Sequence, residues 1–181
     1  MEARGKTIEQ WFSMIQQGQI VLPRFQRHEA WRPVQIIGLL ENILRKPSLP
    51  IGALLVLEVG DKELFHSRPI IGAPKPQSKP MMHLLDGQQR MTALWRSLNS
   101  DYDDLSLFVS LKQTIEEGDP EDGEMSSDVP AVEFEKRWEH KGVRRPVWVN
   151  DDHEIFKRDL LPVECLCPGQ LGEKRLATFQ E

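Results

Sequence analysis

The 181-residue sequence has little cysteine, and its two cysteines, Cys165 and Cys167, form a single C-x-C pair. A structural zinc site normally needs four ligands, and no second pair is present to complete one. His153 is the only candidate we find for a third ligand, so we favour two small core residues on one face of a strand. Because a disulfide-stapled secreted fold needs more cysteine, we expect a reduced, cytoplasmic protein.

Long hydrophobic runs are also missing. No apolar run approaches the roughly 20 residues that a membrane-spanning helix needs, and no signal peptide is recognisable before the first predicted helix. We therefore expect a soluble chain without a membrane partner. Hydrophobic residues make up 39% of the sequence and include five tryptophans, which is enough for a core of ordinary size.

Positive charge is in short supply, with 23 basic against 28 acidic residues and a net charge of −5. This balance argues against a protein coated with phosphate-binding charge. However, residues 116–128 carry seven acidic and no basic side chains, so the rest of the chain is net positive and leaves room for a local basic face. We predict solvated loops over 116–128 and over the proline-rich segment 60–80. The second loop is either a lid or partner surface, or a tolerated insertion.

Hydrophobic spacing predicts an α+β domain over residues 1–168, followed at 169–181 by a linker or the start of a truncated C-terminal region. Helices are predicted over 7–18, from Pro33 to Pro47, and from Met91 to Leu98. Strands are predicted over 20–23, 51–59, 81–85, 105–111, 131–138, 147–149, 160–163 and 163–167. Strand 51–59 is apolar on both faces and is expected to be central, whereas 131–138 has one polar face and is expected at an edge.

The stretch that organises the chain is Asp86-Gly87-Gln88-Gln89-Arg90, which joins a predicted strand to a predicted helix. Asp86 can cap the first helical turn, with Gln89 reaching back to it. A cap does not account for Gly87, a poor helix former, or for Arg90, a cation at the positive end of the helix dipole. Exposed helix N–H groups beside a glycine and an arginine favour an anion site, with phosphate as the expected anion.

A second polar cluster follows the first predicted strand and contains Arg24 and Arg27. If the two strands are neighbours, Arg24, Arg27 and Arg90 can converge on one phosphate-rich ligand, because the guanidinium fork binds two oxygens at once. The alternative is that Arg24 and Arg27 pair with Glu29 or Glu41 on the surface and contribute little.

Together these segments resemble the DGQQR-domain family, which includes the N-terminal domain of GmrSD-type modification-dependent restriction enzymes. The resemblance covers roughly residues 7–98. The residues that carry it are Pro23-Arg24-Phe25-Gln26-Arg27, Trp31, Pro50-Ile51-Gly52 and Leu85-Asp86-Gly87-Gln88-Gln89-Arg90-Met91-Thr92-Ala93-Leu94.

The resemblance implies a ParB/sulfiredoxin-like mixed sheet with flanking helices. It also implies a nucleoside triphosphatase that uses Mg²⁺ or a similar divalent cation. The catalytic residues would be Asp86, Gln88 and Arg90, and the nucleotide-binding residues Gln26, Arg27, Gly87 and Gln89. Asp86 would act on the metal or on water, while the metal ligands as a set stay open. In this family the hydrolysis is coupled to a nuclease domain or subunit of a prokaryotic restriction or phage-defence system.

Two motifs are absent, a P-loop of the G-x-x-x-x-G-K-[ST] kind and a recognisable HNH nuclease. Hydrolysis would therefore need another phosphate cradle, and the nuclease would lie outside this chain. A rival hypothesis is a non-catalytic DNA-binding or adaptor module of ParB-like fold, whose arginines contact DNA phosphates. A third is a purely structural role in which Asp86 is only a helix cap.

Overall fold

The computed structural model describes residues 5–46, 52–77, 79–112 and 130–180. Its helices are α1 (Ile8–Gln16), α2 (Pro33–Leu44), α3 (Gln88–Leu98), α4 (Asp152–Phe156) and α5 (Gln170–Gln180), with short 3₁₀ helices η1 (Val147–Asn150) and η2 (Val163–Leu166). Its strands are β1 (Ile20–Pro23), β2 (Leu55–Glu58), β3 (Ser67–Arg68), β4 (Met82–Asp86), β5 (Leu105–Ser110), β6 (Val132–Lys136), β7 (Trp138–His140), β8 (Val143–Arg145) and β9 (Leu160–Pro162). The predicted α+β class is confirmed.

Strands β1 to β4 form a mixed four-stranded sheet in the order β2-β4-β1-β3. β1 and β4 are parallel, with Ile20 opposite Met82, and the other two pairings are antiparallel. The prediction that segment 51–59 is a central strand is wrong, because β2 lies at the edge and its Leu55 is 41% exposed. An apolar run shows that a strand packs against hydrophobic neighbours, but not whether another strand pairs with its second side.

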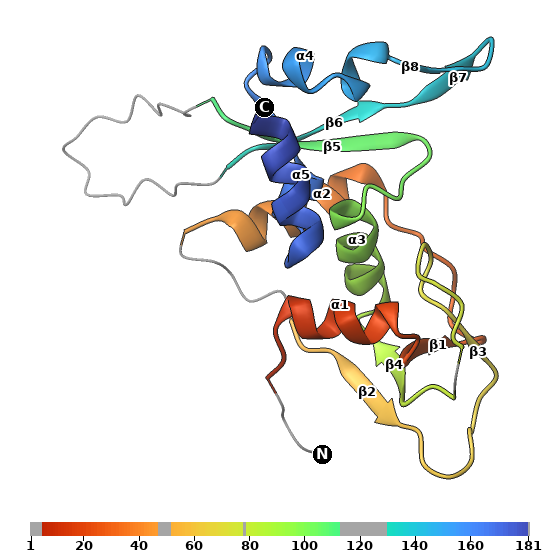
Figure 1. The fold of residues 1–181 in the computed structure, drawn as a ribbon. Coiled ribbons are helices and arrows are strands. Elements are labelled where there is room, and N and C mark those ends of the chain that lie inside the picture. The colour runs from red at the N-terminus through yellow and green to blue at the C-terminus, as the bar shows by residue number, and fades with distance from the viewer. Residues whose placement is uncertain (1–4, 47–51, 78, 113–129, 181) are drawn as a thin grey trace.

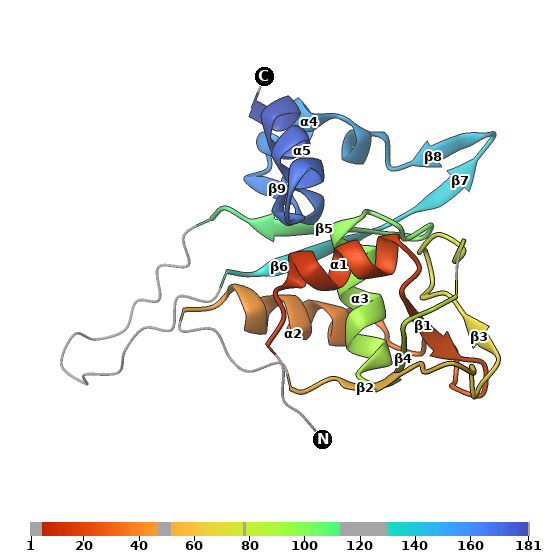
Figure 2. The same ribbon diagram turned by 60° about the horizontal axis from the view of Figure 1, so that its bottom comes forward.

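Strands β5, β6 and β9 form a second sheet, in which β5 is central and β6 lies at the edge as predicted. β7 and β8 form a separate antiparallel hairpin that projects from the body of the molecule (Figure 1). Helices α2 and α3 lie between the two larger sheets (Figure 1), and Figure 2 shows α1 beside them. The hydrophobic core accordingly draws on these helices and on both sheets.

Two predicted strands form 3₁₀ helices instead. Residues 147–149 belong to η1, and the predicted strand through the cysteines becomes η2. Both cysteine thiols are nevertheless free and buried, and burial raises the pKa of each, as expected of core residues. Prolines precede both segments, at Pro146 and Pro162, and such short apolar runs carry too little periodicity to separate a strand from a helical turn.

Residues 170–180 form helix α5, which packs against η2 and is tied to it by Arg175, whose guanidinium binds the carboxylates of Asp152 and Glu164. How the chain divides near residue 168 stays a prediction. The predicted loop 60–80 contains β3 and the buried Ile70, and the acidic stretch 116–128 falls outside the described residues. None of the helices in the described ranges is long and apolar enough to cross a membrane.

The start of α3 differs from the capping prediction. The N-cap is Gly87, which has a left-handed φ of 87°, whereas Asp86 is the last residue of β4 and caps nothing. The chain must turn sharply from strand to helix within one residue, and only glycine adopts that conformation without strain. A side chain at Gly87 would also collide with Leu54. Gly87 is therefore required by the backbone itself.

We predict that Gly87→Ala lowers the free energy of unfolding by about 2 kcal/mol, because the alanine would be held at positive φ against Leu54. Gly38→Ala is the matched control. Gly38 lies inside α2 with open space around the added methyl, so alanine there should stabilise by about 0.5–1 kcal/mol. Urea denaturation of the three proteins measures both effects. Equal stability of the Gly87→Ala variant and the native chain would contradict the prediction.

Candidate functional site

The site lies where two parallel strands end. β1 and β4 are adjacent and parallel, so the segments that leave their carboxyl ends start side by side at one edge of the sheet. Between these segments is an open pocket of about 400 Å³. It is lined by Phe25, Gln26, Arg27, Trp31, Leu85, Asp86, Gly87, Gln88, Gln89 and Arg90. The structure thus brings all seven predicted site residues to one pocket; their chemical roles stay predictions.

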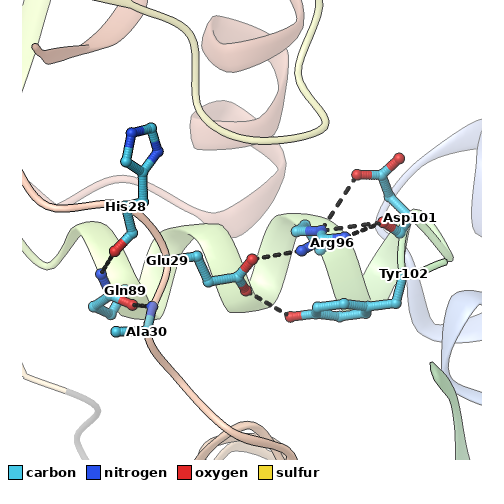
Figure 3. Close-up of polar contacts among 7 residues, drawn as sticks. All are labelled: His28, Glu29, Ala30, Gln89, Arg96, Asp101 and Tyr102. Atoms are coloured by element: carbon cyan, nitrogen blue, oxygen red, sulfur yellow. Dashed lines mark hydrogen bonds and ion pairs between the residues drawn. The ribbon is translucent and has the colours of Figure 1, made fainter. Parts of the chain in front are cut away.

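The two glutamines of the motif bind the backbone of the opposite segment. Gln88 Nε2 donates to the carbonyl of Arg27 at 2.6 Å. Gln89 Nε2 donates to the carbonyl of His28 at 3.1 Å, and its Oε1 accepts the Ala30 amide at 2.9 Å (Figure 3). Both side chains are buried. Each glutamine therefore has a positioning role: it holds the chain between β1 and α2 against the start of α3.

The reverse contact comes from Gln26, whose Nε2 donates to the carbonyls of Leu84 and Leu85 at 2.8 Å each. Arg68 from β3 adds a third tie, with Nη2 at 2.9 Å from the carbonyl of Arg27. Burial lowers the pKa of Arg68, whose charge is held by backbone oxygens. Side chains from the start of α3 and from β3 thus bind residues 24–31, which we call the strap. Gln26, within the strap, binds the end of β4 in return.

The far end of the strap is held by a charged network around Glu29 (Figure 3). One oxygen of Glu29 accepts from Arg96 Nη1 at 2.5 Å, and the other accepts from the Tyr102 hydroxyl at 3.2 Å. The same arginine also donates to the carbonyl of Asp101 and lies over the Tyr102 ring. Desolvation, helped by Glu29, raises the pKa of Tyr102 well above its ordinary value, so the phenol stays protonated as the donor.

This network corrects the surface-pairing alternative, because Glu29 pairs with Arg96 and not with Arg24 or Arg27. The second proposed partner, Glu41, accepts the amide of Val132 and so links α2 to β6. Neither contact can be predicted from local sequence, because Glu29 and Arg96 are 67 residues apart and Glu41 and Val132 are 91 residues apart. The strap is therefore anchored by a partly buried ion pair rather than by surface pairs.

The arginines of the two clusters divide into three kinds. Arg27 lines the pocket, is exposed, and its guanidinium has no partner among the residues that the structure describes. Arg24 is also exposed but does not line the pocket, so its predicted convergence with the other two is wrong. Arg90 lies 3.5 Å from Asp86 and donates to the carbonyl of Ala53 at 2.8 Å. Arg90 thus also joins the start of α3 to the residues before β2.

Among the residues that the structure describes, Asp86 is the one carboxylate that lines this pocket, and its side chain is 73% exposed. Over the described ranges no three His, Cys, Asp or Glu side chains gather as a preformed metal site. An aspartate at a helix start can still contribute one oxygen ligand to a cation that arrives with a phosphate. The pocket therefore combines one accessible carboxylate, one accessible guanidinium and the positive end of α3.

Sequence reasoning missed Arg68 and gave no role to the two pocket aromatics, Phe25 and Trp31. Arg68 lies in the segment 60–80 that reads as a loop, and only the pairing of β3 with β1 brings it to the strap. Phe25 is 69% exposed, packs edge-on against Phe65, and lines the pocket beside Arg27. An aromatic side chain that alternates with arginine and glutamine directly after a buried strand was the available signal for Phe25.

A family model described as "GmrSD restriction endonuclease, N-terminal domain" matches residues 8–162. The chain belongs to this family. The match spans both pocket segments and every strand of both sheets, and it confirms the resemblance drawn from the DGQQR run. Membership makes this GmrSD-type domain a component of a restriction system. No curated protein and no solved structure matches the chain, so the ParB/sulfiredoxin-like detail stays a prediction.

We predict that Glu29→Gln lowers the free energy of unfolding by about 3 kcal/mol, because it leaves the partly buried Arg96 without its carboxylate. Glu154→Gln is the matched control. Glu154 also binds two cations, Lys157 and Arg158, but does so at the surface, where water screens the pairs, and little change is expected. Denaturation midpoints compare the two substitutions. An equal effect of both would show that the strap needs no buried ion pair.

Proposed function

We propose that the pocket binds a nucleoside triphosphate together with Mg²⁺ or a similar cation and hydrolyses it. In this proposal the chain is a regulatory domain whose hydrolysis controls a nuclease outside these residues. One observation carries the proposal. The carboxylate of Asp86, the exposed guanidinium of Arg27 and the start of α3 face a single open pocket at the ends of two parallel strands. Ligands of open α/β sheets are characteristically bound at such strand ends.

The phosphate end of the ligand would lie at the start of α3. The first N–H groups of a helix have no intrahelical partner, and with the helix dipole they favour an anion there. Gly87 lines the pocket, and its left-handed φ of 87° makes the turn that places the start of α3 at the pocket wall. Arg27 can add a bidentate, charge-assisted contact from the opposite wall.

Asp86 is the residue that fits the cation. Mg²⁺ is commonly held by one or two carboxylates together with phosphate oxygens and water, and the pocket offers one accessible carboxylate. A bound Mg²⁺ would supply neutralisation of phosphate charge. Arg90, at 3.5 Å from Asp86, orients the carboxylate and adds positive charge at the same point. The chain thus contributes position and charge rather than a covalent nucleophile, which is what phosphoryl transfer requires.

The base end would lie toward the aromatic side of the pocket. Trp31 is half-buried and Phe25 is exposed, and both line the pocket on the strap side. A volume of about 400 Å³ falls within the range of small-molecule sites, which is roughly 300–1,000 Å³. In this assignment Gln26, Gln88 and Gln89 act through the strap that they hold, and not as direct ligands of the phosphates.

Phosphate release with Mg²⁺, measured over a panel of nucleoside triphosphates, tests the proposal. Asp86→Asn should lower the rate by about 100-fold or more, since it removes the charge that acts on metal and water. Arg27→Met should weaken nucleotide affinity by roughly 10-fold, through loss of one charge-assisted contact.

Arg24→Met is the matched control, because Arg24 lies three residues away on the same strap, is exposed and does not line the pocket. It should leave both affinity and rate unchanged. Two results would contradict the proposal: equal losses for Arg24→Met and Arg27→Met, or no nucleotide binding by calorimetry. Salt-sensitive DNA binding without phosphate release would instead favour the DNA-binding hypothesis.

A further inference from the structure

We propose that the domain has a second binding site, which takes a small organic oxyanion, a carboxylate or a phosphate on an apolar body, at Arg137. The site is a cavity of about 280 Å³ between the end of α3, strand β5 and the elements η1, α4 and η2. We call it the Arg137 pocket. Its polar lining includes Ser97, Ser106, Arg137, Arg144 and Asn150. Two carboxylates, Asp152 and Glu164, also line the cavity, and both are bound by Arg175. It shares no lining residue with the pocket at Asp86.

Arg137 is only 8% exposed, and the three groups that accept its hydrogen bonds are neutral. Nη1 donates to Ser106 Oγ at 3.0 Å, Nη2 to Asn150 Oδ1 at 2.9 Å, and Nε to the carbonyl of Arg145 at 3.3 Å. A guanidinium has five N–H groups, so one N–H on each Nη remains for another acceptor. Two such donors on one planar group are the arrangement that grips both oxygens of an oxyanion.

No carboxylate in the described part of the chain forms an ion pair with Arg137. The other buried or half-buried arginines of this region differ, since Arg96 pairs with Glu29 and Arg175 with Asp152. Burial, and then the neighbouring Arg144, lower the pKa of Arg137, against a weaker opposite effect of Glu135. Arginine nevertheless stays charged in proteins. The fold therefore holds a buried positive charge whose missing counter-ion an anionic ligand can supply.

The rest of the cavity defines the body of the ligand. Apolar side chains of Leu107, Phe108, Val149 and Ile155 line it, so a bare inorganic ion would leave this surface unused. The buried hydroxyl of Ser97 lies near that of Tyr102 but has no partner at hydrogen-bond geometry within the described ranges. It lines the cavity and offers a further donor. The volume of about 280 Å³ lies just below the roughly 300 Å³ at which sites for drug-sized ligands begin, so it suits a smaller molecule, with about one ring beside its charged group.

Calorimetric titration of the full chain with benzoate, phenyl phosphate and inorganic phosphate tests the site. We expect one of the two aromatic anions to bind at least 10-fold more tightly than inorganic phosphate, and the tighter of the two identifies the charged group. Asn150→Asp is the decisive variant. It keeps the acceptor for Arg137 but supplies a carboxylate 2.9 Å from it, so binding should fall by at least 10-fold.

The same substitution should not harm the fold, because it adds a counter-ion to a buried charge, and a rise in melting temperature of about 2–4 °C is expected. Asn42→Asp, the same change at an exposed position of α2 outside the pocket, should alter neither quantity. Three results would overturn the proposal: no binding of either aromatic anion, undiminished binding by Asn150→Asp, or loss of binding in Arg27→Met, which would place the anion in the other pocket.

Discussion

The exchange of hydrogen bonds between the strap and the start of α3 is the constraint on which the candidate site depends. Gln26 binds the backbone at the end of β4, and Gln88 and Gln89 bind the backbone of the strap. Each segment therefore donates hydrogen bonds to backbone carbonyls of the other, which the pairing of the two strands does not supply. The parallel pairing of β1 with β4 fixes only the strand ends, and these contacts, together with Arg68 and the Glu29 network, set the position of Arg27 relative to Asp86.

This arrangement changes the meaning of the DGQQR run. Its glycine makes the turn, its two glutamines hold a neighbouring segment, and its arginine joins the helix start to Ala53. Of the five residues in this run, only Asp86 has a side chain that is mostly exposed. A short polar motif between a strand and a helix can thus be required mainly to build a pocket. Few of its side chains then need to contact the ligand directly.

Local sequence patterns were enough to predict the elements that depend on capping residues, proline positions and the alternation of polar and apolar residues. The helix predicted over 7–18, the proline at the start of α2 and the polar face that puts β6 at an edge all appear as predicted, and a capping box of Thr7 with Gln10 begins the first helix. The convergence of the two polar clusters could also be predicted, given that their strands are neighbours.

The sequence does not indicate which distant residues bind one another. Glu29 pairs with Arg96, 67 residues away, and Arg68 binds the strap because β3 pairs with β1. Asp86 was assigned a cap because capping statistics describe helix starts without regard to the strand before them.

Hydrogen exchange at the backbone amide of Ala30 tests the central claim most directly. Ala30 is exposed, and its amide donates to Gln89 Oε1 at 2.9 Å. The amide should exchange slowly in the native chain and rapidly in Gln89→Ala, while amides inside α3 keep their protection. Fast exchange in the native chain, or equal protection in the variant, would show that Gln89 does not hold the strap.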